Sequence, residues 1–127
     1  MSKYPGTVLI VDDDAAVRSA LKFALEAEGL EVRLYDGSTA LLADVDLPRH
    51  SCLVVDYRMP GMDGLELIDA LRTREVALPA ILITGRAGRD LRSRAAKSGV
   101  CHVLEKPLSD GALIESIRSI LQRSAIQ

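Results

Sequence analysis

The chain has 127 residues, which is the ordinary size of one domain and too short for two substantial ones. Hydrophobic residues make up 48% of it, a share typical of a globular protein and too high for a disordered one. The formal net charge of -2 argues against nucleic-acid binding by the domain as a whole. We therefore expect a single globular domain with its core from about residue 7 to residue 123. Aromatics are only 3%, so this core must be aliphatic.

Cysteine usage and hydropathy bear on the cellular setting. Cys52 and Cys101 lie far apart, each within an apolar run, which favours two buried small side chains over a disulfide or a metal cluster. No stretch approaches the roughly 18 consecutive apolar residues that span a bilayer. Residues 1–6 also lack the layout of a signal peptide. These features predict a cytoplasmic protein that does not act in a membrane.

In chain order, five short apolar runs predict β-strands at residues 7–11, 31–35, 52–56, 80–84 and 102–106. The first, third and fourth runs are continuously apolar, which is typical of strands covered on both faces. The second run alternates between apolar and polar residues, so it indicates an edge strand with one wetter face.

Helical patterns separate these strands. The first helix follows Asp14, a typical N-cap residue, and is expected to end at Gly29. The others are predicted at about residues 38–45, 65–74 and 90–98, and from about residue 109 onward. Strands that alternate with helices favour a parallel sheet covered by helices on both faces, so the predicted fold class is α/β.

Polar side chains end or directly follow four of the predicted strands at their carboxyl ends, the edge where such sheets bind ligands. In chain order they are Asp12 and Asp13, Asp56, Thr84 and Lys106. Carboxylates that converge repel one another unless a cation neutralises them, and an all-oxygen ligand set suits Mg²⁺ rather than Zn²⁺. A carboxylate beside such an ion can attack a phosphoryl group, with the hydroxyl and the ammonium binding its oxygens.

Each of these residues also has a simpler explanation when it is taken alone. Asp14, beside the acidic pair, is best explained as a helix cap. Asp12 and Asp13 could be solvated loop acids. Thr84 could be an ordinary strand-end residue, and Lys106 a surface lysine. Their joint placement at successive strand ends favours a phosphoryl-binding site over these separate explanations.

These segments resemble the receiver domain of two-component response regulators. The resemblance covers about residues 8–121 with every motif in order: V-L-I-V-D-D-D at 8–14, V-V-D-Y-R-M-P-G-M-D-G at 54–64, I-L-I-T-G at 81–85 and L-E-K-P at 104–107. It implies a flavodoxin-like fold with a five-stranded parallel sheet in the order 2-1-3-4-5. That strand order is carried over from the family.

The resemblance assigns the reacting groups residue by residue. It implies that Asp56 is the phosphoacceptor, that Thr84 is the switch hydroxyl, and that Lys106 is the cation that pairs with the phosphoryl group. The bond between Lys106 and Pro107 would be cis, as in the family. Gly85, directly after the switch hydroxyl, would leave room for the phosphodonor.

The resemblance also implies Mg²⁺ as the cofactor. Asp13 and Asp56 would bind the ion directly, and Asp12 would bind it mostly through water. The main-chain carbonyl of Arg58 would supply a further ligand. The side chains of Arg58 and Arg86 could shield the site, steer an anion, or simply be solvated.

Phosphorylation by a sensor histidine kinase or a histidine phosphotransfer protein would bias a surface around residues 90–98 and the strand at 102–106. That surface is basic, with Arg86, Arg89, Arg92, Arg94 and Lys97. It would contact a target, or a second copy of the chain in a homodimer that includes the last helix. A solvated charged face explains the same cluster equally well.

One departure from the family concerns signal output. Val103 stands where the family often has an aromatic residue, so rotation of a bulky ring toward the switch hydroxyl is not available. Movement of the backbone around the fourth strand and helix would then carry the signal. His102, next to it, is expected to be a half-exposed strand residue.

Three alternatives remain open. A phosphohydrolase of the haloacid-dehalogenase type also uses an aspartyl nucleophile with Mg²⁺, but Ala15-Ala16 follow the acidic cluster here in place of the usual Gly-Thr. A degenerate receiver that only binds partners would not need the complete set of site residues. The chain is also either a stand-alone receiver or a fragment of a larger regulator. We expect a signalling switch rather than an enzyme, without direct nucleic-acid binding by this chain.

Overall fold

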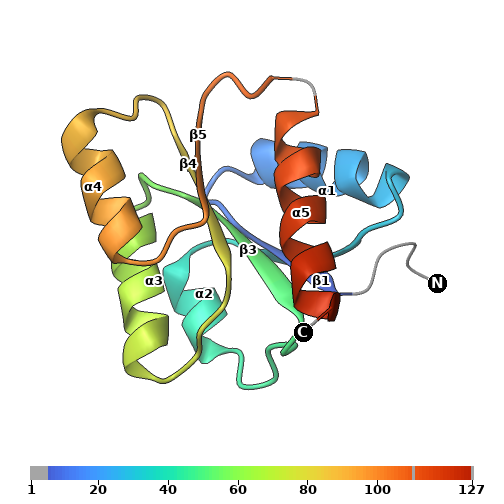
Figure 1. The fold of residues 1–127 in the computed structure, drawn as a ribbon, viewed down its shortest axis with the longest axis horizontal. Coiled ribbons are helices and arrows are strands. Elements are labelled where there is room, and N and C mark those ends of the chain that lie inside the picture. Colours follow the sequence, from blue (N-terminus) through green and yellow to red (C-terminus); the bar gives the residue numbers. More distant parts are fainter. Residues whose placement is uncertain (1–5, 110, 127) are drawn as a thin grey trace.

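The computed structural model describes residues 6–109 and 111–126, the last three by their backbone alone. Within this range, five parallel strands form one sheet in the order β2-β1-β3-β4-β5 (Figure 1). The strands are β1 (Thr7–Val11), β2 (Glu31–Tyr35), β3 (Ser51–Asp56), β4 (Ala80–Thr84) and β5 (His102–Glu105). The predicted fold class and strand order are confirmed.

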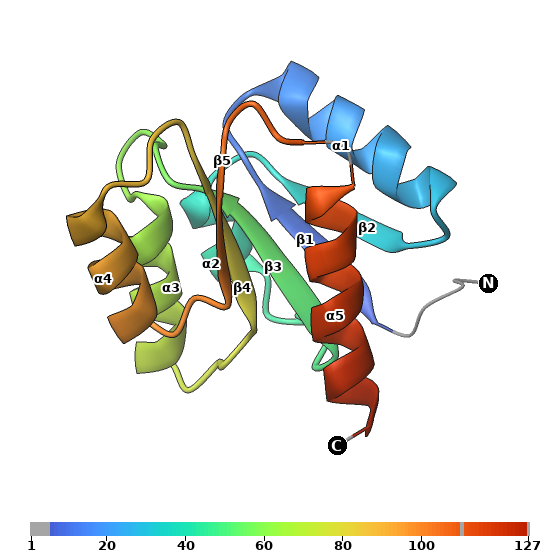
Figure 2. The same ribbon diagram turned by 45° about the horizontal axis from the view of Figure 1, so that its top comes forward.

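Helices cover both faces of this sheet. They are α1 (Ala15–Ala27), α2 (Ser38–Ala43), α3 (Gly64–Thr73), α4 (Arg89–Lys97) and α5 (Ala112–Ile126). Helices α1 and α5 lie on one face, and α2, α3 and α4 lie on the other (Figure 2). None of the helices in the described part of the chain has the length and apolarity needed to cross a bilayer.

The strand sequences follow from this layering. Successive side chains of a strand point to opposite faces, so a strand covered on both sides must be apolar throughout. In β1, Leu9 and Val11 pack with α2, α3 and α4, whereas Val8 and Ile10 pack with α1 and α5. Strand β2 lies at the sheet edge and alternates between exposed and covered residues, as its sequence predicts.

Local signals set most of the helix ends. The Asp14 carboxylate accepts hydrogen bonds from the backbone N–H groups of Ala16 and Val17, which confirms it as the N-cap of α1. Gly29 follows that helix with a φ of 85°, a conformation that suits glycine.

Two helices differ from the prediction. Helix α2 ends at Ala43 rather than Val45, because Asp44 adopts an extended conformation and its carboxylate accepts a 2.6 Å hydrogen bond from the Tyr35 hydroxyl. Helix α5 begins at Ala112 rather than near Ser109, since Gly111 has a φ of 86° and cannot belong to the first helical turn.

The two cysteines differ in exposure, so one part of the sequence prediction was wrong. Both are free, and Cys52 is buried within β3, but Cys101 is exposed in the turn that leads into β5. Its backbone N–H donates to the Ala80 carbonyl, which holds the main chain against the sheet while the residue remains open to solvent. Burial, with a smaller effect from the charge of Cys101, raises the pKa of the Cys52 thiol to about 12.

We expect iodoacetamide to alkylate the exposed Cys101 in the native protein and to leave Cys52 unmodified, since the Cys52 thiol is buried and its pKa is raised. Peptide mapping by mass spectrometry measures each site, and both should react in concentrated urea. The variant Cys101→Ser should take up no label when folded. Native-state labelling of Cys52 at the rate of Cys101 would contradict this expectation.

Candidate functional site

Three carboxylates meet at the carboxyl edge of the sheet. Strands β1 and β3 pair in parallel with Val11 opposite Val55, so the residues that follow them emerge side by side. One carboxylate oxygen from each of Asp12, Asp13 and Asp56 lies within 4.8 Å of the others. The expectation that acids far apart in the sequence come together at this edge is confirmed.

The burial of these acids is unequal. Asp12 is 5% exposed and Asp56 is 7% exposed, whereas Asp13 faces solvent. Burial raises the pKa of Asp12 and the nearby charges of Asp56 and Asp13 add to this effect, although a hydrogen bond from the Asp14 N–H opposes it. An all-oxygen cluster that combines like charge, burial and one accessible member fits a hard divalent cation such as Mg²⁺.

Lys106 pairs with Asp56, one of the two buried members of this cluster. Its Nζ lies 3.0 Å from Oδ1 of Asp56, while the lysine side chain itself stays half-exposed. Burial alone would lower the pKa of Lys106, but the hydrogen bond and charge of Asp56, with Asp12 and Asp13 behind it, outweigh burial and raise that pKa. The Lys106–Pro107 peptide bond is cis, as expected.

Thr84 lies at the same edge of the sheet, but its hydroxyl contacts the loop that follows β4. It is buried at the end of β4, and its hydroxyl donates a 3.1 Å hydrogen bond to the Arg86 carbonyl in the loop between β4 and α4. The hydroxyl is therefore bonded to this loop and not to the acidic cluster. Around Gly85, no heavy atom outside the adjacent residues lies within 4 Å of a Cβ built on that glycine, so the approach at this point is open.

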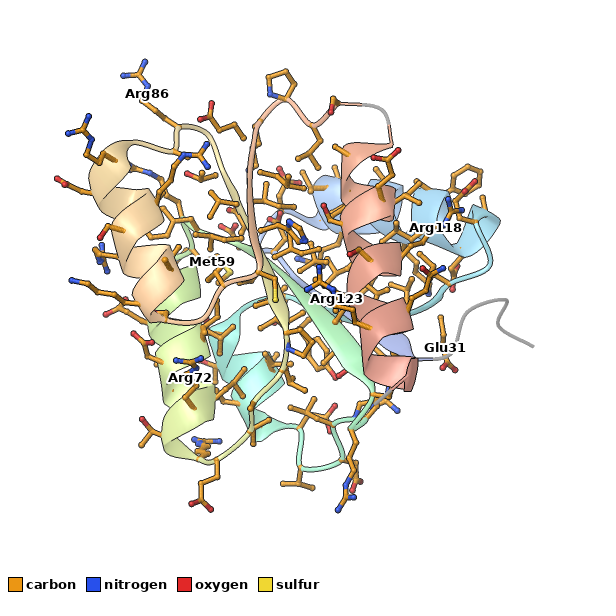
Figure 3. All side chains as sticks on the ribbon, viewed as in Figure 1. Glu31, Met59, Arg72, Arg86, Arg118 and Arg123 are labelled. Carbon is orange, nitrogen blue, oxygen red and sulfur yellow. The ribbon has the colours of Figure 1, made fainter. Side chains whose placement is uncertain are left out.

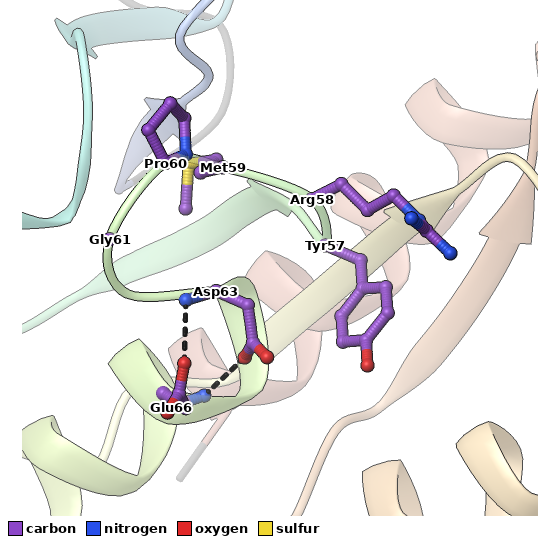
Figure 4. Close-up of a pocket in the computed structure, with 7 residues that line it drawn as sticks. All are labelled: Tyr57, Arg58, Met59, Pro60, Gly61, Asp63 and Glu66. Atoms are coloured by element: carbon purple, nitrogen blue, oxygen red, sulfur yellow. Dashed lines mark hydrogen bonds between the residues drawn. The ribbon is translucent and has the colours of Figure 1, made fainter.

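The loop after Asp56 is held by backbone hydrogen bonds and a helix cap. The Gly64 N–H donates to the Tyr57 carbonyl at 2.8 Å, and Asp63 and Glu66 form a reciprocal capping box at the start of α3 (Figure 4). An open hollow of about 580 Å³ lies along this loop, and its lining includes Arg58. The role of the Arg58 carbonyl as a metal ligand stays a prediction.

The sequence profile of the response regulator receiver domain family matches residues 8–118. The chain belongs to this family. The fold of the receiver and the convergence of its acidic residues agree with that membership.

Individual relatives support the same assignment. The transcriptional regulatory protein FixJ of Azorhizobium caulinodans is 44% identical over 121 residues, which cover 94% of this chain and 57% of the relative. DctD of Pseudomonas aeruginosa, a C4-dicarboxylate transport transcriptional regulatory protein, is 38% identical over 115 residues, which cover 91% of this chain and 25% of the relative. The crystal structure of FixJ-N superimposes with a TM-score of 0.84 at 36% identity and covers 96% of both chains. This receiver thus spans little more than half of FixJ and a quarter of DctD.

The strand before Lys106 carries Val103 and His102, whose burial the structure gives. Val103 is partly buried against the core on the side of α2, α3 and α4. His102 is also partly buried, as predicted for a half-exposed strand residue. The effect of Val103 on signal output stays a prediction.

One polar contact of the site was missed by the sequence interpretation. The Arg18 side chain donates a 2.7 Å hydrogen bond from Nη1 to the main-chain carbonyl of Asp12. This bond ties the first turns of α1 to the end of β1 and fixes the backbone that carries the acidic pair. Helical spacing puts Arg18 on α1, but no sequence pattern shows that its guanidinium folds back onto the preceding strand.

Replacing Asp12 with Asn is expected to raise the free energy of unfolding by about 1 kcal/mol at pH 7 without metal. The pKa of Asp12 is higher in the folded chain than its ordinary 3.8. The free energy of unfolding therefore falls as pH rises from 3.8 through the higher pKa of folded Asp12. At neutral pH the full cost of burying the Asp12 charge is present. Urea unfolding measures the gain.

The exposed acid Asp69 on α3 supplies the matched control, and Asp69→Asn should change stability little. Saturating Mg²⁺ should shrink or reverse the advantage of the Asp12 variant, because binding stabilises the wild type. A loss of stability in Asp12→Asn without metal would contradict the electrostatic interpretation.

Proposed function

We propose that this receiver is a phosphorylation switch that accepts a phosphoryl group on Asp56 in a Mg²⁺-dependent reaction. The donor is a sensor histidine kinase or a histidine phosphotransfer protein. The observation that carries the proposal is the pairing of the nearly buried Asp56 carboxylate with Lys106 at 3.0 Å, inside a cluster of three acids. Family membership supports the same chemistry.

The chain's own groups have distinct tasks in this transfer. A carboxylate oxygen of Asp56 attacks phosphorus, the bond from phosphorus to the donor imidazole nitrogen breaks, and the imidazole leaves. Asp12, Asp13, Asp56 and the Arg58 carbonyl would hold Mg²⁺, which would supply positive charge to offset the charge that builds up on the phosphoryl oxygens. Lys106 then pairs with a phosphoryl oxygen in place of the carboxylate.

Thr84 completes the switch. Its hydroxyl must leave the Arg86 carbonyl, to which it donates at 3.1 Å, before it can donate to a phosphoryl oxygen. The added group carries roughly -1.5 to -2 charges and three strong acceptors, enough to bias a loop between two positions. The loop precedes α4, so the output surface comprises α4 and β5.

That output surface binds either a target protein or, together with α5, a second copy of the receiver. Its five basic side chains suit an acidic partner. We propose a regulatory role in the cytoplasm, since FixJ and DctD are transcriptional regulators by name. In this proposal the receiver itself contacts neither DNA nor a membrane, and it is a switch rather than a turnover enzyme.

The test is to incubate the protein with Mg²⁺ and a small phosphodonor such as acetyl phosphate and to measure its intact mass. The wild type should gain the mass of one phosphoryl group, and Asp56→Asn should gain none. Omission of Mg²⁺ should also abolish the gain. Equal gain in both proteins would place the acceptor elsewhere, and steady release of phosphate at many turnovers would favour a phosphohydrolase.

A further inference from the structure

A single arginine of α4 joins the loop that must move to the strand that carries Lys106. The Arg92 Nε donates a 3.2 Å hydrogen bond to the Ala87 carbonyl, in the middle of the loop between β4 and α4. The Nη2 of the same guanidinium lies 3.3 Å from Oε1 of Glu105, the last residue of β5. One planar side chain therefore connects the loop and β5.

These contacts reinforce the position in which Thr84 faces away from the acidic cluster. The Thr84 hydroxyl donates to the Arg86 carbonyl, and Ala87 is the next residue along the loop. The Arg86 and Ala87 carbonyls belong to consecutive residues, so a loop shift that carries the Arg86 carbonyl away from the hydroxyl is expected to strain the bond from Arg92 to the Ala87 carbonyl. The two bonds hold adjacent peptide units, so they restrain the same motion.

The other basic residues of this surface do not share the arrangement. Arg94 donates to the Tyr57 hydroxyl at 3.3 Å and does not reach the loop. Among the described residues, Arg86, Arg89 and Lys97 have no side-chain hydrogen bond or ion pair, and Figure 3 shows Arg86 extending outward from the carboxyl edge of the sheet. The link between loop and strand thus depends on Arg92 and its partner Glu105.

We propose that Arg92 is a positioning residue that holds the loop between β4 and α4 in its unphosphorylated arrangement and thereby slows phosphoryl uptake by Asp56. This inference rests on the proposed function. Arg92 and Glu105 are each about half-exposed, at 52% and 49%, so solvent screens their attraction. We call the two contacts of Arg92, with the Ala87 carbonyl and with Glu105, the latch. The latch is weak, so its removal should accelerate phosphoryl uptake about two- to five-fold rather than by orders of magnitude.

The experiment compares initial rates of phosphorylation by acetyl phosphate with Mg²⁺, followed by intact mass. The variants Arg92→Gln and Arg92→Lys should both be about two- to five-fold faster than wild type, because neither side chain can hold the Ala87 carbonyl and Glu105 together. Glu105→Gln should be faster by a smaller factor. The double variant should match Arg92→Gln alone, since both changes open the same latch.

The control is Arg89→Gln, which removes the same charge from the same helix at a position without a side-chain partner. This variant should leave the rate at the wild-type value or slow it slightly, because less positive charge remains to attract the anionic phosphodonor. Arg92→Lys keeps the charge, so acceleration in that variant separates the latch from electrostatics. Unfolding midpoints measured in parallel should stay close to wild type, as expected for half-exposed positions.

The outcomes are distinct. If the wild type takes up no phosphoryl group, or takes it up elsewhere than on Asp56, the proposed function itself fails. If the wild type reacts on Asp56 but the Arg92 variants are no faster than the wild type and Arg89→Gln, only the proposed role of Arg92 is overturned. Additive acceleration in the double variant would also overturn it, because the two residues would then act independently.

Discussion

Replacing Lys106 with Met is expected to slow phosphoryl uptake by Asp56 about 100-fold. Removing one group that stabilises charge in the transition state commonly lowers a rate by about that factor. The ammonium already lies 3.0 Å from Oδ1 of Asp56, so it needs only a short shift to reach an oxygen of the incoming group. Met retains the length and the apolar stem of lysine but carries no charge. Initial rates with acetyl phosphate and Mg²⁺, measured by intact mass, give the factor.

The free energy of unfolding of the same variant should be about 1 kcal/mol lower than that of the wild type, after allowance for solvent screening of the half-exposed lysine. The Asp56 carboxylate is 7% exposed and would lose its counter-charge. Adding Asp56→Asn to Lys106→Met should restore this stability, since it removes the unpaired charge.

Lys97→Met supplies the control, because Lys97 is an exposed lysine on α4. Its rate and its stability should both stay near those of the wild type. Wild-type phosphorylation in Lys106→Met would remove Lys106 from the transfer step. A double variant less stable than either single variant would show that the ion pair is not the source of the stability.

Much of this receiver could be predicted from its sequence, because the deciding signals are local. The continuous apolar runs of β1, β3 and β4 follow from burial on both faces, and the alternation in β2 follows from its edge position. Parallel strands place their carboxyl ends at one edge, so the meeting of Asp12, Asp13 and Asp56 could be expected once the fold class was settled.

The remaining features depend on contacts between distant segments, which periodicity does not report. Cys101 lies in an apolar run, yet its place in the turn before β5 leaves it exposed. The end of α2 depends on the hydroxyl of Tyr35, which reaches Asp44 from β2. The direction of the Thr84 hydroxyl depends on the path of the following loop. Each result is set by a partner that no nearby sequence pattern specifies.

Replacing Gly64 with Ala is expected to destabilise the receiver by about 2 kcal/mol, a typical cost of forcing extra volume into a packed site. A Cβ at Gly64 would lie 2.8 Å from the Asp56 carbonyl oxygen, 2.9 Å from Leu82 Cδ1 and 3.2 Å from Tyr57 Cα. The leucine methyl can rotate away, but the other two contacts are with backbone. Alanine's better helix propensity recovers at most about 1 kcal/mol, so the clash decides the sign.

The clash also bears on the proposed function, because the obstructing backbone belongs to Asp56, the proposed phosphoacceptor, and to the residue after it. The Tyr57 N–H donates to the Ile83 carbonyl at 2.8 Å, so the segment after Asp56 is fixed to β4 and has little freedom to yield. Relief of the overlap must therefore move α3 outward or shift Asp56 from its neighbours. We expect uptake of the phosphoryl group to slow along with the loss of stability, both measured as for Lys106.

Gly85→Ala is the matched control for stability, since no heavy atom outside its adjacent residues lies within 4 Å of the added methyl group. Its free energy of unfolding should stay within about 0.5 kcal/mol of the wild type. The two measurements on Gly64→Ala then separate the ways in which the overlap is relieved. Loss of stability with normal uptake means that α3 moves and Asp56 keeps its place, whereas loss of both means that Asp56 itself is displaced. Unchanged stability would contradict the close packing of α3 against the end of β3.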